Sequence, residues 1–193
     1  ELVEVPAGPF LMGDRYLRLD LPRFWISKFP ITNAQYAAFV EAGGYGDPRY
    51  WKEAIAAKAW KSGWATGYDG ESRDRPSHSP APFGLANHPV VGITWYEALA
   101  FTRWLTERRC ELGKMEPGSE VRLPSEAEWE KAARGGVELA PGKPNDDPKR
   151  KYPWLGAIDP QRANYDDTGI GATSAVGCFP GGASPYGVED LSG

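Results

Sequence analysis

The sequence predicts a loop-rich α+β fold with short strands and about three helices. One observation is a helix-start signal that occurs three times: a hydroxyl residue followed three positions later by Glu or Gln. The other is composition, since 23 Gly and 18 Pro among 193 residues require many turns. Eight Trp, nine Tyr and seven Phe offset this, because large aromatic side chains bury much apolar area each.

The clearest predicted helix lies within RLPSEAEWEKAARGG, residues 122–136. Ser125 and Glu128 can cap each other's backbone N–H groups, and Pro124 keeps the preceding chain extended. The pair Gly135-Gly136 provides a positive-φ stop. At helical spacing, Trp129 shares a stripe with two alanines, Ala132 and Ala133, and is therefore expected to anchor the helix in the core.

The same capping signal predicts two further helices. Thr32 with Gln35 opens the segment NAQYAAFVEAGG, and Thr94 with Glu97 opens WYEALAFTRWLTER. The face of the second of these helices is expected to carry Trp95, Leu99, Thr102 and Leu105.

Short apolar runs predict the strands. Residues 2–12 have the pattern of a hairpin in which a Pro-Ala-Gly turn joins two strands. Residues 24–30 are predicted to contain a strand that leads to the Thr32 cap, and residues 87–93 another that leads to the Thr94 cap.

Residues 45–88 are predicted to be a long, aromatic-rich insertion within one domain that covers 1–193. Its middle, residues 69–82, is rich in Ser, Pro, Asp and Arg and is expected to be exposed. Two interpretations stay open: its aromatic residues attach the insertion to the body, or the insertion is a functional loop. Its aromatic residues include Tyr50, Trp51, Trp60, Trp64, Tyr68 and Phe83.

The charge pattern argues against nucleic acid and membrane partners. The net charge is −4 with a pI near 5.3, and no basic cluster is interleaved with aromatic residues. The longest apolar runs are far shorter than the roughly 20 residues that span a bilayer, and the start of the chain lacks a signal-peptide pattern. The expectation is a soluble, cytoplasmic protein. The two cysteines, Cys110 and Cys178, are expected to be reduced core thiols.

Six segments, in this order, resemble the formylglycine-generating enzyme family, also called the sulfatase-modifying factor type. The segments are PAGPFLMG (6–13), ITNAQYAAFV (31–40), NHPVVGITWYEALAF (87–101), RLPSEAEWEKAARGG (122–136), ANYDDTGIGATSAVGCFP (163–180) and YGVEDLSG (186–193). The resemblance covers nearly the whole chain and implies a fold similar to a C-type lectin. Domains that resemble this family include oxidases, iron-dependent sulfoxide synthases and non-catalytic binding proteins, so the resemblance predicts fold better than chemistry.

The resemblance also implies what this chain is expected to lack. The family's pattern continues beyond the equivalent of residues 190–193 with a Trp-Glu-Trp segment and a C-terminal part that carries a copper-binding cysteine pair. Neither Cys110 nor Cys178 occupies that place, and a soft Cu(I) site needs at least two thiolates within reach. No catalytic residue is therefore predicted in this chain.

The best metal-site candidate is the segment NYDDTGIG, residues 164–171. Calcium prefers carboxylate, amide and main-chain oxygens, which a Gly-rich loop can present. The resemblance implies structural calcium bound by the side chains of Asn164 and Asp167 and by the main-chain oxygens of Tyr165 and Ile170. The alternative is an Asx-type turn without metal.

Other chemistries lack their minimal signatures. His78 and His88 are too few for a histidine-rich metal centre and are expected to be structural or exposed. The carboxylates of Glu126, Glu128 and Glu130 spread around a helix, which disfavours an acid/base pair. No phosphate-binding GxxxxGK[ST] motif and no GxSxG elbow occurs.

The preferred functional hypothesis is a non-catalytic domain that binds a protein or a small ligand through its loops. The resemblance is compatible with a variable protein of a diversity-generating retroelement. The alternative is a copper-dependent oxidase that makes formylglycine from a sulfatase cysteine, with its catalytic cysteines beyond Gly193. An iron-dependent sulfoxide synthase, the third hypothesis, is expected to bring a histidine-rich helical domain.

Overall fold

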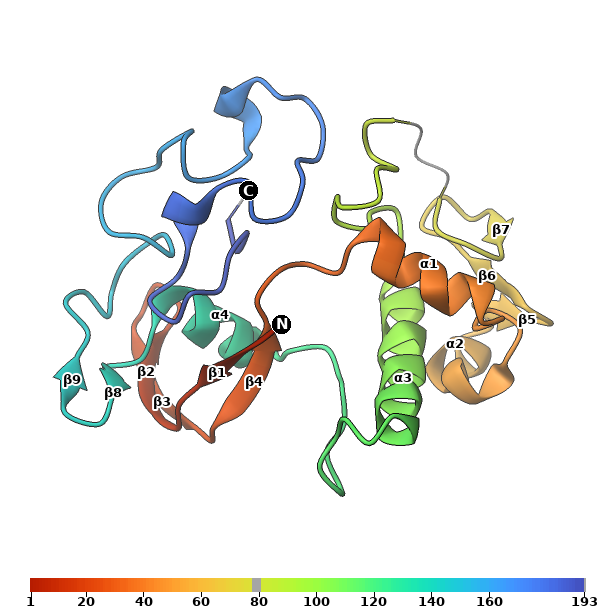
Figure 1. The fold of residues 1–193 in the computed structure, drawn as a ribbon, viewed down its shortest axis with the longest axis horizontal. Coiled ribbons are helices and arrows are strands. Elements are labelled where there is room, and N and C mark those ends of the chain that lie inside the picture. Colours follow the sequence, from red (N-terminus) through yellow and green to blue (C-terminus); the bar gives the residue numbers. More distant parts are fainter. Residues whose placement is uncertain (78–80, 193) are drawn as a thin grey trace. The chain divides into compact units, whose positions relative to one another are not determined.

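The computed structural model describes residues 1–77 and 81–192 (Figure 1). Contacts between Cα atoms divide the chain into two compact units: residues 1–30 with 124–193, and residues 31–123. Both the mixed α+β class and the abundance of loops are confirmed. The prediction of one domain over 1–193, with an insertion at 45–88, stays a prediction. None of the helices in the described stretches is long and apolar enough to cross a membrane.

The first unit begins with two antiparallel strand pairs. Strand β1 (Leu2–Val5) pairs with β4 (Phe24–Ser27), and β2 (Gly8–Met12) pairs with β3 (Leu17–Leu21). The hairpin predicted for residues 2–12 is therefore wrong, because its two strands belong to different sheets. The tight turn lies one strand later, at Gly13–Tyr16, where both terminal residues have positive φ and the Tyr16 N–H donates to the Gly13 carbonyl.

Helix α4 (Glu126–Arg134) confirms the capping signal of the first unit. The Ser125 hydroxyl accepts a hydrogen bond from the Glu128 N–H at 3.2 Å, and the Glu128 carboxylate accepts one from the Ser125 N–H at 2.8 Å. Gly135 ends the helix with φ 87°, and a Cβ on Gly136 would lie 2.7 Å from the Glu138 carbonyl oxygen. Both glycines of the stop are thus required by backbone geometry.

The buried face of α4 differs from the predicted one. The two alanines of the stripe are buried, but Trp129 is 45% exposed and does not anchor the core. Lys131 is 1% exposed instead, and its Nζ donates to the carbonyl oxygens of Pro6 and Gly8 at 2.7 and 2.8 Å. The helix packs against β2, and the lysine on its buried face supplies donors to carbonyls at the junction of β1 and β2.

Short elements complete the first unit. A hairpin of β8 (Glu138–Ala140) and β9 (Lys143–Pro144) follows α4 in the chain. Single 3-10 turns follow at Asp166–Thr168 and Pro180–Gly182. The buried apolar residues of this unit include Val5, Phe10, Ala132, Trp154, Ala163 and Val188.

Lys131→Ala tests this use of a buried ammonium group. We expect a loss of about 2–4 kcal/mol in the free energy of unfolding, because two carbonyls lose their donor and a cavity is left. Urea unfolding followed by circular dichroism measures it, with exposed Lys143→Ala as the control. A loss no larger than that of the control would show that Lys131 does not hold the junction of β1 and β2.

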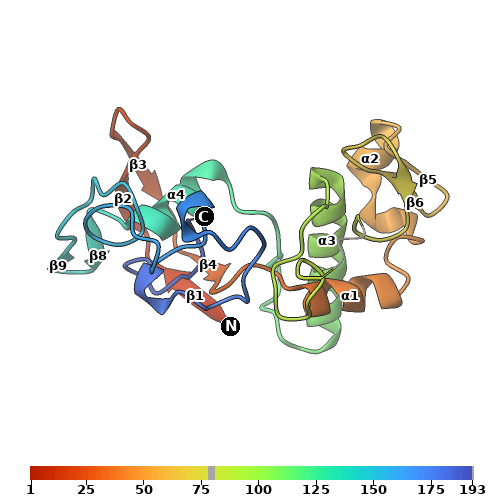
Figure 2. The ribbon, with the colours of Figure 1, turned by 90° about the horizontal axis from the view of Figure 1, so that it is seen from above.

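The second unit is built on two helices. Helix α1 (Asn33–Glu41) crosses α3 (Trp95–Glu111), and both begin with the predicted capping boxes (Figure 1). Between them come the 3-10 turn Pro48–Tyr50, the short α2 (Lys52–Ala56), and a three-stranded sheet. The strands of that sheet are β5 (Trp60–Lys61), β6 (Trp64–Thr66) and β7 (Ser72–Arg73). Figure 2 shows β5 and β6 beside α2.

Two predictions for the second unit are corrected. Residues 87–93 form no strand: the described contact is one isolated bridge between Thr32 and Pro89, and Pro89 has no N–H to donate to a ladder. On α3 the predicted face is correct only in part. Thr102 is buried and Leu105 packs against the core, but Trp95 is exposed. The other buried residues of the helix are Glu97, Ala100 and Phe101.

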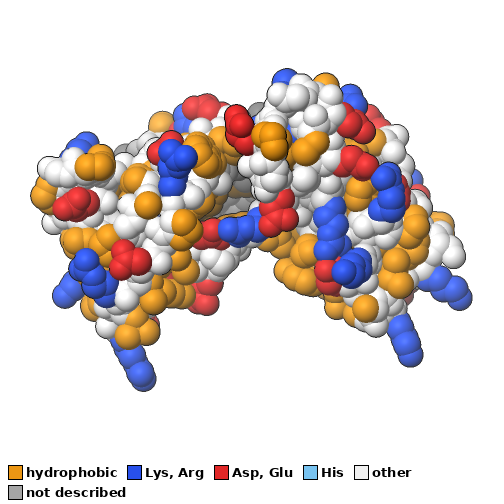
Figure 3. Space-filling view, turned by 90° about the horizontal axis from the view of Figure 1, so that it is seen from below, with side chains coloured by type: hydrophobic (Ala, Val, Ile, Leu, Met, Phe, Trp, Pro, Cys, Tyr) orange, Lys and Arg blue, Asp and Glu red, His pale blue; other side chains and the backbone are white. Residues whose placement is uncertain are grey.

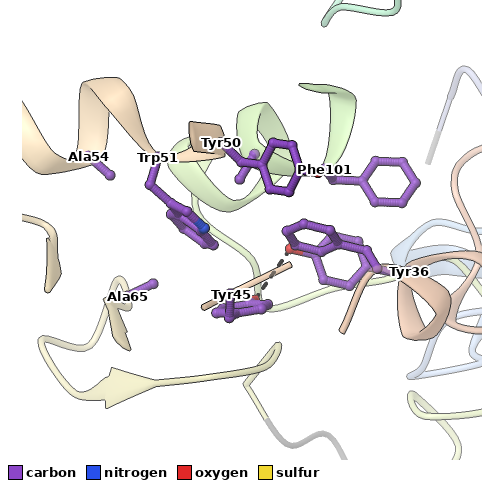
Figure 4. Packing of buried hydrophobic residues seen from close by; sticks show 9 residues of the cluster. Tyr36, Tyr45, Tyr50, Trp51, Ala54, Ala65 and Phe101 are labelled. Atoms are coloured by element: carbon purple, nitrogen blue, oxygen red, sulfur yellow. Dashed lines mark hydrogen bonds between the residues drawn. The ribbon is translucent and has the colours of Figure 1, made fainter. Parts of the chain in front are cut away.

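The core of the second unit is a cluster of aromatic rings (Figure 4). Tyr36 stacks on Phe101 with ring centroids 5.2 Å apart, and Phe39 packs edge-on against both rings. Tyr45 lies 5.0 Å from Trp51, so residues of the predicted insertion complete this core. The hydroxyls of Tyr36 and Tyr45 are 3.3 Å apart, which places two polar groups inside the cluster.

Glu97 satisfies those polar groups. It is fully buried, and its Oε1 accepts a hydrogen bond from the Tyr45 hydroxyl at 2.6 Å. Its Oε2 accepts one from the Thr94 N–H at 2.7 Å, and its main-chain oxygen accepts one from Tyr36 at 3.3 Å. Burial is the main cause that raises the pKa of both tyrosines, so both phenols stay neutral donors.

The three capping boxes offer a matched test. Glu97→Ala is expected to cost about 3–5 kcal/mol of unfolding free energy, since it removes a cap and the carboxylate acceptor of the buried Tyr45 hydroxyl. Gln35→Ala removes the same capping contact from α1 at an exposed position and should cost about 0.5–1 kcal/mol. Equal losses in denaturant titrations of the two variants would contradict a core role for Glu97.

Candidate functional site

The predicted calcium loop forms a closed turn in the first unit. Residues Asp166–Thr168 make one 3-10 turn, and Gly169 ends it in the left-handed conformation with φ 68°. The Thr168 N–H donates to the Tyr165 carbonyl at 2.9 Å. This is the turn geometry that an Asp-Asp-Thr-Gly sequence favours, so a local signal explains the loop's backbone.

Two of the four predicted ligand oxygens converge within this turn. The Thr168 hydroxyl lies 3.1 Å from Asn164 Oδ1 and 2.5 Å from the Tyr165 carbonyl oxygen. One hydroxyl hydrogen cannot serve both acceptors at once, and the Tyr165 carbonyl also accepts the Thr168 N–H. The Asn164 Nδ2 donates to the Ala172 carbonyl at 2.8 Å, which orients the amide so that Oδ1 faces the turn.

The other two predicted ligands are less tied to this point. Asp167 and Ile170 are exposed, and in the described chain neither hydrogen-bonds to Asn164 or Tyr165. Partial burial raises the pKa of the Tyr165 phenol, and the Asp167 charge adds to that rise. Within residues 1–77 and 81–192, no three His, Cys, Asp or Glu side chains gather as a metal site would require.

The remaining candidates for chemistry are dispersed. Cys110 and Cys178 are both free and exposed, so the prediction of core thiols is wrong; each unit holds one. Neither unit by itself therefore offers the thiolate pair that Cu(I) needs. His88 is buried, and His78 lies outside the described residues. Glu130 accepts a hydrogen bond from the Gly13 N–H at 2.8 Å and pairs with Arg134, which is a structural role.

Two hollows of similar size lie among the described residues of the second unit. One of about 330 Å³ lies between α1 and residues 75–77, 84 and 90–91, and its wall includes Val40, Arg75 and Val90. The other, of about 320 Å³, lies on the small sheet. Its lining residues are Lys58, Trp60, Lys61, Ser62, Trp64, Thr66 and Ser72. Both volumes reach the lower end of the range for small-ligand sites. We call the second one the sheet hollow.

Strand register separates the two faces of the small sheet. Trp60 pairs with Ala65 and Ala65 with Arg73, so these three residues share the inner face. Trp60 anchors that face, because its Nε1 donates to the Tyr45 carbonyl at 2.9 Å and its ring stacks on Trp51.

The outer face carries the remaining residues of the sheet. Lys61 pairs with Trp64, and Thr66 with Ser72, so all four project to the side opposite the core. Trp64 is 52% exposed. The signal that sequence reasoning missed is the Ser62-Gly63 turn, where φ values of 52° and 91° are those of a two-residue hairpin.

The contacts of the 45–88 segment bear on the first of its two interpretations, attachment to the body, while a functional loop stays a prediction. Tyr45, Tyr50 and Trp51 are buried and attach the segment to the core. Trp64 and Tyr68 do not attach the segment to the core, because both are exposed, Tyr68 by 73%. On the face drawn in Figure 3, acidic, basic and apolar side chains are interspersed.

Comparison with known families identifies the fold. The family described as the sulfatase-modifying factor enzyme 1-like domain matches residues 1–193. The chain belongs to this family. The resemblance predicted from the six sequence segments is thereby confirmed, while the expected likeness to C-type lectins stays a prediction.

Relatives of this domain carry different names. Hercynine oxygenase of Mycolicibacterium smegmatis is 30% identical over 99% of the chain and 43% of its own length. Serine/threonine-protein kinase pkn1 of Chlamydia caviae is 31% identical over 100% of the chain and 26% of its own length. Formylglycine-generating enzyme of Streptomyces coelicolor is 31% identical over 82% of the chain and 51% of its own length. The chain thus spans about half or less of these relatives.

A solved structure supports the fold. The crystal structure of CarF has a TM-score of 0.57 and 21% sequence identity, over 100% of this chain and 76% of that one. At this identity the likeness bears on architecture alone. The site must therefore be argued from the residues of this chain.

Proposed function

We propose that this domain is a non-catalytic binding module on a formylglycine-generating-enzyme-type scaffold, and that it contacts a ligand or protein through the outer face of β5–β6–β7. The observation that carries the proposal is Trp64, an indole left 52% exposed on a sheet whose opposite face is anchored in the core. Trp is enriched among residues that dominate binding energy. Because strand β6 fixes the backbone of Trp64, little backbone conformational entropy is lost when a partner covers the indole.

The two faces of the small sheet can serve separate roles, one in stability and one in binding. The inner face of the small sheet packs on Trp51 and Tyr45, whereas side chains of the outer face can change without disturbing the core. A variable protein of a diversity-generating retroelement would use the same separation of stability from contact surface.

Binding through this face is tested with arrayed glycans and peptides. We expect Trp64→Ala to weaken any ligand found by at least about tenfold, since a well-packed aromatic anchor contributes 2 kcal/mol or more. Trp25→Ala, which removes a similarly exposed indole from the first unit, should leave binding unchanged. If a ligand binds both variants as tightly as the unaltered protein, the contact surface lies elsewhere.

Calcium is the second part of the proposal, with a structural role. Asn164 Oδ1 and the Tyr165 carbonyl oxygen would supply two hard ligands, since both already face one hydroxyl. The exposed Asp167 carboxylate and the Ile170 carbonyl would complete the protein's contribution. A cation there would tie residues 164–170 together, which a chain poor in regular structure needs in this region.

The calcium proposal predicts a change in thermal stability. Calcium at about 100 times its dissociation constant should add about 2.7 kcal/mol to unfolding free energy and raise Tm. Asp167→Ala should abolish that rise, and Asp166→Ala, its neighbour in the same exposed turn, should keep it. Absence of calcium by elemental analysis, together with an unchanged Tm in chelator, would remove the site.

An oxidising enzyme is the alternative, favoured by relatives named hercynine oxygenase and formylglycine-generating enzyme. Neither unit of this chain contains two cysteines, so no copper step can be assigned to its residues. Incubation of the protein with copper and a cysteine-containing sulfatase peptide, followed by mass spectrometry, decides between them. Formylglycine in that peptide would replace the binding-module proposal.

A further inference from the structure

We propose that the sheet hollow binds a saccharide that carries a carboxylate or sulfate group. The inference rests on the proposed binding function and names the ligand class for its contact surface. Three properties of the hollow lead to it: an exposed indole, a set of hydroxyl groups, and two lysines without acidic partners.

The indole provides the apolar component. Trp64 presents its side chain on the outer face of the sheet, and Trp60 also lines the hollow. A sugar ring has a face made of C–H groups, which can pack on a flat aromatic surface. An exposed apolar patch with a polar rim is the usual appearance of such a binding groove.

The hydroxyls distinguish a saccharide from a flat aromatic anion. Ser62, Thr66 and Ser72 line the same hollow, and each hydroxyl can donate and accept a hydrogen bond. Sugar hydroxyls have the same double capacity, so each group can adapt to the other. An aromatic anion would use the indole and the charges but would leave most of these hydroxyls to water.

The lysines specify an acidic ligand. In the described part of the chain, neither Lys58 nor Lys61 forms an ion pair, although the whole chain carries a net charge of −4. Arg73 of the same sheet is neutralised by Asp69, and the exposed Glu71 does not line the hollow. The two ammonium groups therefore give this hollow a local positive charge that attracts a carboxylate or sulfate.

Two side chains of the hollow sit at backbone positions that carry a local conformational cost for any residue except glycine. Among the described residues, four that are not glycine have positive φ, and Lys58 and Ser62 are two of them. Lys58 follows the end of α2, and Ser62 is the first residue of the hairpin turn; Gly is the residue best suited to both places. Strained non-glycine positions gather at functional sites, and both of these line one hollow.

The experiment uses three oligosaccharides of matched length: one with uronate groups, one with sulfate groups and one neutral. Binding to the whole protein is measured by calorimetry and by tryptophan fluorescence. We expect the uronate or the sulfate form to bind at least tenfold more tightly than the neutral form, and less tightly at higher salt. The double variant Lys58→Ala with Lys61→Ala should lose at least tenfold, and Trp64→Ala should lose binding. Lys52→Ala, an exposed lysine of α2 outside the hollow, is the control.

Lys58→Gly gives a second readout that does not depend on a loss of folding. We expect it to raise Tm, because Gly adopts positive φ without strain, and at the same time to weaken binding of the acidic saccharide. A purely structural role of Lys58 would raise Tm and leave binding unchanged, which would overturn its assignment.

The outcomes separate this inference from the proposed function. Equal binding of neutral and acidic saccharides, or binding of a nucleotide or an acidic peptide alone, would overturn the acidic saccharide and keep a binding module if Trp64→Ala still abolishes binding. If a folded protein binds no saccharide, nucleotide or peptide, both the inference and the proposed contact surface fail.

Discussion

A single buried carboxylate, that of Glu97, organises the second unit. Two phenols lie inside a cluster of aromatic rings, and each would be costly there without an acceptor. Glu97 accepts from one through its side chain and from the other through its main chain, while its second carboxylate oxygen caps the helix that carries it. Helix start, aromatic core and the contact between α1 and α3 are thereby joined at one residue.

The small sheet depends on that core in turn. The Tyr45 hydroxyl donates to Glu97, and the Tyr45 carbonyl accepts a hydrogen bond from the indole of Trp60. Tyr45 therefore links the carboxylate to a residue that lines the sheet hollow. Stacking of Trp60 on Trp51 fixes the inner face. The side chains of the outer face project away from the core. They can therefore be replaced by side chains of different chemistry without loss of stability.

A comparable arrangement holds the first unit, with the charge reversed. Lys131 lies buried beneath α4 and donates to two carbonyls of the bend between β1 and β2. Burial lowers the pKa of this lysine, and its hydrogen bonds to the carbonyls offset part of that cost. Each unit thus uses a buried ionisable side chain, extended from a capped helix, to satisfy backbone or phenol groups that apolar packing alone would leave unpaired.

The sequence by itself determined the α+β class, the family and the three capped helices, because capping pairs and glycine stops are encoded within a few neighbouring residues. Only the tertiary structure decided what each helix buries. The three capping boxes look alike in sequence, yet Gln35 is exposed, whereas Glu97 lies inside an aromatic core. Trp129 and Trp95, the obvious apolar anchors, are exposed, and the polar Lys131 and Glu97 are buried in their place. Helical spacing shows which residues share a face, but the partners that need a donor or an acceptor come from distant parts of the chain. The same limit explains the pairing of β1 with β4 and the exposure of Trp64, which depend on contacts that no local pattern records.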